Sequence, residues 1–208
     1  MSAKLNEMQR NALGRLDIER LNDMQSAALE HCCQNDSMVL LSPTGTGKTL
    51  AFLLPLLDRL DASCKGVQAM IVLPSRELAR QVFDVWRAMS TPFQMTALYG
   101  GRPLEQEIAS LGGASTAVIV GTPGRLLDHL NRLSFTVDKC THLVIDEFDK
   151  CLEMGFQDEM SKLIDKLPAV KSRFLISATD AAEIPQFAGA SDIVKLDYPK
   201  YFHHVVLQ

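Results

Sequence analysis

The segment Ser42–Thr49 has the residue types and spacing of a loop that binds phosphate groups. It reads Ser-Pro-Thr-Gly-Thr-Gly-Lys-Thr and directly follows the apolar run 38–41. Two glycines let the backbone turn so that successive N–H groups point into one concavity, where an anion can bind. A helix that begins at Lys48 would add the positive end of its dipole, and the Lys48 amine could reach the β- and γ-phosphates. We therefore expect nucleotide binding here, although Ser42 stands where the strict G-x-x-x-x-G-K-T pattern has glycine.

Acidic residues follow a second apolar strand candidate. Asp146, Glu147 and Asp149 come directly after the run Leu143–Ile145. In an open α/β sheet, side chains at the carboxyl ends of the strands line the ligand site. Asp146 would hold Mg²⁺ together with the Thr49 hydroxyl, and Glu147 would orient or deprotonate an attacking water. A solvated acidic turn is the alternative, which the preceding strand and the phosphate loop make the weaker one.

Bulk composition indicates one soluble α/β domain. The chain has 208 residues, of which 47% are hydrophobic and 22% charged, as in ordinary globular proteins. Its net charge of −4 argues against a general affinity for nucleic acid, so any such binding must depend on local groups. Five cysteines, an odd number, indicate a reducing compartment rather than a disulfide framework.

The start of the chain is typical of a mixed polar helix and lacks the apolar stretch of a signal peptide. The longest apolar run, Leu50–Leu57, contains Pro55 and is too short to cross a bilayer. We therefore expect a protein without a membrane partner that is cytoplasmic, or nuclear if it is eukaryotic.

The apolar pattern predicts strands that alternate with helices. Strands are expected at 38–41, 69–73, 96–99, 117–120, 143–146, 174–177 and 193–196. Helices are expected at 48–60, 76–89, 104–111, 124–132, 158–167 and 181–187. Continuous apolar strands in such alternation are typical of a parallel sheet covered by helices on both faces.

Six motifs stand in the order and at the spacings of the DEAD-box family of ATP-dependent RNA helicases, which the chain resembles from about Gly14 to its end. They are the phosphate loop, Pro74–Ala79, Gly100-Gly101, Thr122–Arg125, Asp146–Asp149 and Ser177-Ala178-Thr179. The resemblance implies a RecA-like P-loop NTPase lobe over residues 1–197, and the start of an interlobe linker over 198–208. It also implies ATP and Mg²⁺ as ligands, bound at Thr44, Gly45, Thr46, Gly47, Lys48, Thr49, Asp146 and Asp149, with Lys48, Asp146 and Glu147 in catalytic roles.

The resemblance assigns two further roles around the nucleotide. Gln25 would read the adenine edge, because its amide can donate and accept a hydrogen bond at once; the alternative is an amide on a helix surface. Ser177 and Thr179 would hydrogen-bond to Asp149 and so link the ATP site to RNA. For these two residues the alternative is a turn of small residues after a strand.

The RNA backbone would be bound by residues of three further motifs, which are Arg76, Gly101, Arg102, Thr122, Gly124 and Arg125. A helix that opens at Pro123-Gly124 has free N–H groups that can bind a phosphate. Taken singly, Arg76 or Arg125 could instead form a surface ion pair. Contacts to phosphate and sugar carry no sequence information, so the resemblance implies RNA binding without sequence specificity.

Three features depart from the family's pattern. Phe148 replaces the usual alanine between Glu147 and Asp149, where we expect local repacking without loss of activity. The segment before Gln25 lacks the family's proline, and no clear aromatic residue stands further upstream, where Met8 lies near its place. Nothing after Thr179 is long enough to be the family's second RecA-like lobe, so we expect the first lobe of a longer protein, or a natural fragment.

The function implied by the resemblance is an ATP-dependent RNA helicase, which couples ATP binding and hydrolysis to RNA binding and local duplex unwinding. Its second lobe would be a partner of this one, and the lobe alone would be a nearly inactive monomer. Two alternatives stay open: another P-loop enzyme, such as a DNA helicase or a nucleotide kinase, and an ATP-gated RNA clamp in which Phe148 slows hydrolysis.

Overall fold

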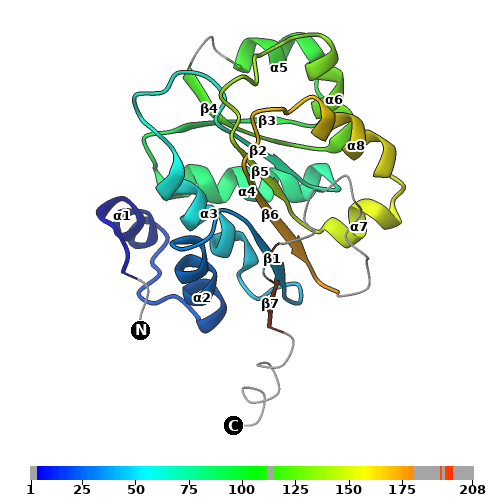
Figure 1. Ribbon diagram of the computed structural model, residues 1–208. Helices are drawn as coiled ribbons and strands as arrows, with labels where there is room; N and C mark the ends of the chain where they lie inside the picture. Colours follow the sequence, from blue (N-terminus) through cyan, green and yellow to red (C-terminus); the bar gives the residue numbers. More distant parts are fainter. Residues whose placement is uncertain (1–3, 112–114, 180–192, 194, 199–208) are drawn as a thin grey trace.

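Parallel strands form one sheet in the order β3-β4-β2-β5-β6-β1-β7 (Figure 1). This computed structural model describes residues 4–111, 115–179, 193 and 195–198. Within them the strands are β1 (Met38–Leu41), β2 (Ala69–Val72), β3 (Gln94–Leu98), β4 (Thr116–Gly121), β5 (His142–Ile145), β6 (Ser172–Ser177) and β7 (Lys195–Asp197). Each of the six strand pairings is parallel. All the carboxyl ends therefore lie at one edge of the sheet.

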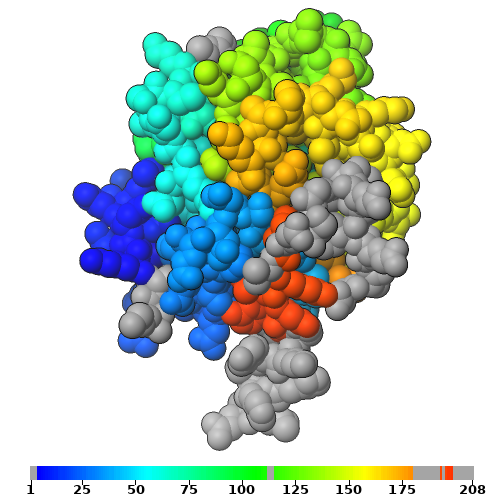
Figure 2. Space-filling view, in the orientation of Figure 1, coloured from blue at the N-terminus to red at the C-terminus, as the bar shows by residue number. Residues whose placement is uncertain are grey.

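Helices cover both faces of the sheet. One face carries α1 (Glu7–Arg15), α2 (Asp23–Cys32), α3 (Lys48–Arg59) and α4 (Arg76–Met89). The other carries α6 (Pro123–Asn131), α7 (Phe148–Glu153) and α8 (Gln157–Asp165), and α5 (Leu104–Ser110) contacts β3. Figure 2 shows α1 and α2, in blue, at the side of the molecule, where both contact α3. No helix of the described part is long and apolar enough to cross a membrane.

Alternate residues of each strand face opposite layers of the core. In β1, Met38 and Leu40 belong to the cluster beneath α1–α4, whereas Val39 and Leu41 belong to the cluster beneath α6–α8. Side chains alternate across a strand, so a strand covered on both faces must be apolar throughout. This double burial explains the continuous apolar runs in the sequence, and it confirms the predicted α/β fold with helices on both faces.

The predicted elements match the structure closely in the first 177 residues. Strand 38–41 and helix 76–89 coincide with β1 and α4, and the other predicted elements differ from their counterparts by up to two residues at either end. The last strand is β7, two residues later at its start than predicted, while helix 181–187 and residues 199–208 lie outside the described residues. Helices α2 and α7 have no counterpart among the predicted elements.

Candidate active site

The strand order divides the carboxyl edge of the sheet into two groups of loops. The acidic corner is formed by the loops after β1, β5 and β6, three neighbouring strands. The arginine corner is formed by the loops after β2, β3 and β4, which are neighbours at the other end of the sheet. Among the motif residues in these loops, those predicted to bind nucleotide all lie in the acidic corner. Those predicted to bind RNA all lie in the arginine corner.

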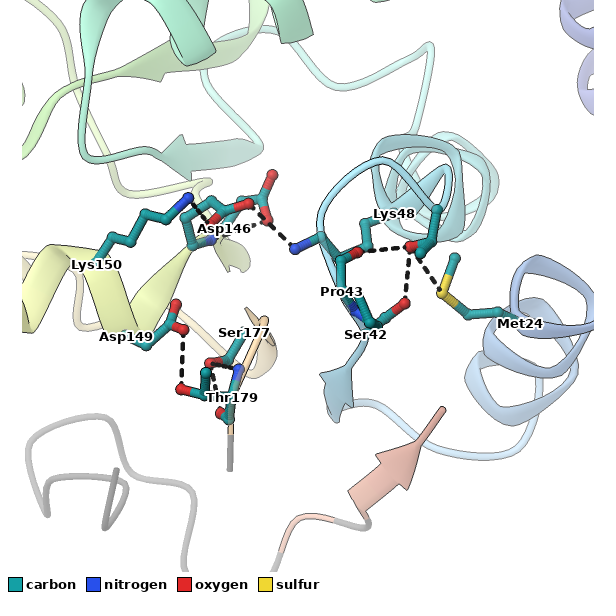
Figure 3. Close-up of polar contacts among 11 residues, drawn as sticks. Met24, Ser42, Pro43, Lys48, Asp146, Asp149, Lys150, Ser177 and Thr179 are labelled. Carbon is teal, nitrogen blue, oxygen red and sulfur yellow. Dashed lines mark hydrogen bonds and ion pairs between the residues drawn. The ribbon is translucent and has the colours of Figure 1, made fainter. Parts of the chain in front are cut away.

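The phosphate loop is held by its own side chains. Ser42 is buried, and its Oγ lies 2.7 Å from Oγ1 of Thr46, which also donates to the carbonyl of Pro43 at 2.9 Å (Figure 3). Where the strict pattern has glycine, this chain therefore has a serine whose side chain makes a hydrogen bond inside the loop. Gly47 caps α3 with φ +85°, a left-handed conformation that favours glycine. Thr44 and Gly45 are exposed, and Thr49 is half-buried.

Helix α2 holds the carbonyl side of the same loop. The Asn22 side-chain amide donates to the carbonyl of Thr46 at 2.9 Å, and Nε2 of Gln25 donates to the carbonyl of Gly47 at 3.1 Å. Oε1 of Gln25 accepts from the backbone N–H of Asn22 at 3.0 Å, which completes a capping box at the start of α2. Both ends of the Gln25 amide are thus bound to protein groups, and its reading of adenine stays a prediction.

Two lysines, labelled in Figure 3, form ion pairs with Glu147, one at each carboxylate oxygen. Nζ of Lys48 lies 3.1 Å from Oε1, and Nζ of Lys150 lies 2.7 Å from Oε2 in an ion pair without hydrogen-bond geometry. Strands β1 and β5 are separated by β6 alone, a gap of about 10 Å between strand axes, which a lysine and a glutamate side chain bridge together. Lys48 and Glu147 are each 6% exposed, so their ion pair is screened little by water.

A backbone turn at Glu147 makes this pairing possible. Glu147 precedes α7 and has φ 53° and ψ 46°, a left-handed conformation that costs a non-glycine residue about 1–2 kcal/mol. The following residue, Phe148, is buried in the apolar cluster beneath α6–α8. The large side chain that departs from the family's alanine is therefore part of the core. Strain at a residue predicted to be catalytic is typical of functional sites.

Asp146 is buried beside these charges and can serve as a metal ligand. Its Oδ1 accepts from the backbone N–H of Glu147 at 2.9 Å. The pKa of Asp146 is raised to about 6, chiefly by burial; the charge of Lys48 opposes this shift and the charge of Glu147 adds to it.

Asp146 and Thr49 together offer carboxylate and hydroxyl oxygens, the hard ligands that Mg²⁺ prefers. The described residues contain no group of three His, Cys, Asp or Glu side chains that could enclose a metal. Two protein ligands still fit Mg²⁺, which commonly keeps several waters and takes its other ligands from phosphates.

The loop after β6 reaches the last acidic residue. Oγ1 of Thr179 donates to Oδ2 of Asp149 at 3.0 Å (Figure 3). Ser177 binds Thr179 instead of Asp149: its Oγ donates to the Thr179 carbonyl at 2.7 Å and accepts from the Thr179 N–H at 3.2 Å. Oδ1 of Asp149 is buried without a hydrogen-bond partner among the described residues, so it can accept a bond from a ligand or water.

The arginine corner contains a groove of about 330 Å³ between the start of α4 and the loop after β3. Gly101 forms part of it with φ +100°. The guanidinium of Arg102 lies over the ring of Tyr99 at 5.3 Å. Arg76 is 64% exposed, and its ion pair with its neighbour Glu77 at 2.7 Å is of the surface kind that adds little to stability.

Two of the predicted RNA-binding segments meet at the start of α6. Thr122 is the N-cap of α6, and its side chain makes no capping hydrogen bond, so the N–H groups of the first turn, including that of Gly124, stay open to a phosphate. Arg125 is bound within the protein: its Nε donates to Oε2 of Glu107 at 2.6 Å and its Nη2 to the Arg102 carbonyl at 2.7 Å.

Sequence reasoning missed three charged residues in these corners. Lys150 pairs with Glu147, Arg80 lines the groove beside Arg76, and Glu107 binds Arg125. Helical spacing is a signal for the first two, because Lys150 is three residues after Glu147 and Arg80 four after Arg76. No local pattern reveals Glu107, since its partner is 18 residues away in sequence.

Comparison with known proteins places this geometry in a family. A family model described as DEAD/DEAH box helicase matches residues 22–187. The ATP-dependent RNA helicase CshA of Listeria monocytogenes is 36% identical over 170 residues, which are 81% of this chain and 32% of that protein. The ATP-dependent RNA helicase DeaD of Mycobacterium tuberculosis is 36% identical over 171 residues, 81% of this chain and 30% of that protein. The chain thus spans about a third of the length of these curated relatives.

Solved structures agree with the sequence relatives. A DEAD box protein from the hyperthermophile Methanococcus jannaschii superposes with a TM-score of 0.84 at 30% identity, over 93% of this chain and 54% of that one. The DEAD-box helicase Mss116 bound to ssRNA and UDP-BeF superposes with a TM-score of 0.82 at 26% identity, over 93% and 43% of the two chains. The RecA-like fold implied by the motifs is confirmed, and the chain belongs to the DEAD/DEAH box helicase family.

Proposed function

We propose that the chain is the ATP-binding lobe of an ATP-dependent RNA helicase. The observation that carries the proposal is the buried contact between Lys48 of the phosphate loop and Glu147 of the acidic motif, 3.1 Å apart at the carboxyl edge of the sheet. It supports the proposal because an amine that could bind phosphate and a carboxylate that could act as a general base lie within one ligand's reach. The family and the relatives' names favour this reading over a DNA helicase or an RNA clamp with little hydrolysis.

Each residue of the acidic corner has a role in this proposal. Thr49 and Asp146 would hold Mg²⁺, which supplies charge that neutralises the phosphates. The phosphates would compete with Glu147 for the Lys48 amine, which leaves the Glu147 carboxylate free to orient a water. Lys150 stays beside the other oxygen of Glu147 and keeps that carboxylate in place. Thr179 lies in the loop after β6, and its hydrogen bond to Asp149 would couple this loop to the nucleotide site.

The chain alone should bind Mg·ATP yet hydrolyse it scarcely. Its described acidic corner offers lysines on one side of the site, and an arginine that faces the γ-phosphate from a second lobe would be needed for turnover. Such an arginine contributes about 10³–10⁵ to the rate in related phosphoryl-transfer enzymes. RNA binding should be weak and sensitive to salt, because the chain's net charge of −4 gives no general attraction.

Calorimetry with Mg·ADP tests the nucleotide part of the proposal. Lys48→Ala should weaken binding by about 10–100-fold, since a charged hydrogen-bond donor to the phosphates is lost. Lys162→Ala, on the exposed side of α8, is the matched control and should bind like the unmodified chain. Equal affinities for the unmodified chain and Lys48→Ala would remove the phosphate loop from the site.

A phosphate-release assay tests the part of the proposal that requires a second lobe for ATP hydrolysis. We expect negligible turnover of Mg·ATP by this chain, with or without single-stranded RNA. Rapid RNA-stimulated turnover would show that a second lobe is unnecessary and would overturn this part of the mechanism.

A further inference from the structure

A buried carboxylate joins the two RNA-binding segments of the arginine corner. Glu107 of α5 is 1% exposed at its side chain and accepts three hydrogen bonds. Oε1 accepts from the backbone N–H of Tyr99 at 3.1 Å, at the start of the loop that carries Gly101 and Arg102. Oε2 accepts from Nε of Arg125 at 2.6 Å and from Nε2 of His129 at 2.9 Å, both on α6. One carboxylate thus ties the loop after β3 to the first turns of α6.

Arg125 adds a second tie between the same segments. Its Nη2 donates to the Arg102 carbonyl at 2.7 Å, and its Nη1 lies 3.8 Å from a carboxylate oxygen of Asp128. Each of its three nitrogens therefore faces a protein acceptor, and the side chain is only 20% exposed. Arg76, by comparison, is 64% exposed, and within the described part of the chain its ion pair is with its sequence neighbour Glu77. The geometry of Arg125 is that of a structural brace, unlike the open guanidinium of Arg76.

We infer that Glu107 and Arg125 form a clamp that sets the separation of the two RNA-binding segments, and that Arg125 acts through this clamp instead of touching RNA. This inference rests on the proposed RNA-binding function. The groups that would bind phosphates, at Gly101 and in the first turn of α6, are backbone groups of a loop and of a helix terminus. Such groups bind a rigidly spaced phosphate backbone only if their own spacing is fixed. Glu107 is thereby a positioning residue for RNA binding.

The clamp predicts that neutralising Glu107 changes RNA affinity in the direction opposite to that expected from charge alone. Removing a negative charge near an RNA site should strengthen RNA binding if charge alone matters. Under the inference, Glu107→Gln weakens it: Oε1 of the amide still accepts from Tyr99, while its NH₂ group turns a donor toward Arg125 and His129. We expect about a tenfold loss of affinity, the scale of coupling between residues in one hydrogen-bond network.

The test measures the affinity of the chain for a fluorescein-labelled 15-nucleotide oligo(U) by anisotropy at fixed salt. Glu107→Gln, Arg125→Gln and Arg125→Lys should each weaken binding by a similar factor, and the double variant Glu107→Gln/Arg125→Gln no more than either alone. Mg·ADP affinity, measured on the same samples, should stay unchanged because the acidic corner is untouched. Arg125→Lys is informative because it keeps the charge and loses the planar fork.

Hydrogen exchange gives a readout that needs no RNA. In Glu107→Ala the Tyr99 amide should exchange faster, whereas in Glu107→Gln it should keep its protection, since the amide oxygen can still accept. RNA binding by Glu107→Gln at or above the affinity of the unmodified chain would overturn the inference, and so would full affinity of Arg125→Lys. If the unmodified chain failed to bind RNA even at low salt, the RNA-binding part of the proposed function would be refuted. That result is distinct from one in which the chain binds RNA and the variants are unaffected.

Discussion

The two corners of the carboxyl edge differ in how they present the charged residues that line their proposed ligand sites. In the acidic corner Lys48, Asp146 and Glu147 are buried and bind one another or the backbone. In the arginine corner Arg76 and Arg80 are 64% and 72% exposed, and among the described residues their ion pairs are with neighbours on their own helix. Buried charges of fixed geometry suit a small ligand whose phosphates can take the place of one charged side chain as the partner of another. Exposed arginines on a shallow groove suit a long polyanion bound by its backbone.

The acidic corner also carries two costs to stability, one in its backbone and one in a buried carboxyl group. Glu147 has a left-handed backbone, and the buried Asp146 has a raised pKa. Gly101, the residue of positive φ in the described arginine corner, is a glycine, to which that conformation costs little. Backbone strain at a non-glycine residue thus lies where the proposed chemistry needs fixed geometry. If the acidic corner binds nucleotide and the arginine corner binds RNA, substitutions in the two corners should have separable effects on the two affinities.

The largest separable effect is expected from two glycines of positive φ, Gly47 in the acidic corner and Gly101 in the arginine corner. In Gly47→Ala a left-handed alanine is strained, and its Cβ would lie 2.6 Å from Nε2 of Gln25. Mg·ADP affinity should fall by about 100-fold, from roughly 1–2 kcal/mol of strain and the displaced Gln25, while RNA affinity stays the same. Gly101→Ala, where Cβ would lie 3.4 Å from Nη1 of Arg76, should do the reverse and weaken RNA binding by about tenfold.

Calorimetry for Mg·ADP and anisotropy for RNA measure the two effects on the same samples. Gly14→Ala in α1 is the control, because no atom lies within 4 Å of its added Cβ, and both affinities should stay unchanged. Loss of both affinities in either corner's variant would show that the corners are one site.

The next effect concerns the stability cost of Asp146. Its pKa is raised from 3.8 to about 6, chiefly by burial, so its contribution to stability is present below pH 3.8 and is lost as the pH rises through about 6. At pH 7.5 the ionised carboxylate costs up to about 3 kcal/mol. Asp146→Asn should therefore raise the free energy of unfolding by about 1–3 kcal/mol at pH 7.5 and by little at pH 4, while it weakens binding of Mg·ADP.

Urea unfolding at the two pH values measures this difference. Arg76→Gln is the counterpart from the arginine corner and should leave stability unchanged, because its ion pair is exposed. A less stable Asp146→Asn at pH 7.5 would contradict the view that the acidic corner is held at a cost.

A smaller effect is expected at Gln25. We expect the chain to prefer ADP over GDP by about tenfold, because guanine would leave the amide's donor or acceptor unpaired. In the ligand-free structure that amide binds Asn22 and Gly47, so adenine must compete for it. Gln25→Glu keeps the acceptor for the Asn22 N–H and loses the donor, and it should remove the preference for ADP. Competition binding with both nucleotides is the measurement, and a preference kept by Gln25→Glu would exclude Gln25 from the base site.

The sequence predicts the sheet and the acidic corner well because both depend on local signals. Apolar runs that are buried on two faces are continuous, and the phosphate loop carries its glycines, lysine and threonine in one stretch. It predicts α7 poorly, because that helix starts at Phe148 immediately after the strained Glu147. It misses Glu107, since an ion pair between residues 18 positions apart depends on how α5 and α6 pack.

The most direct test of the division into two corners is a pair of NMR titrations of the ¹⁵N-labelled chain. Mg·ADP should shift the amide signals of Gly45–Lys48 and Asp146–Glu147, with small changes in the arginine corner. Oligo(U) RNA should shift those of Gly100–Arg102 and Thr122–Arg125, with small changes in the acidic corner. Two disjoint sets of shifts are the predicted result. Shifts at one common set of residues for both ligands would contradict it, as would Mg·ADP shifts that leave the phosphate loop unchanged.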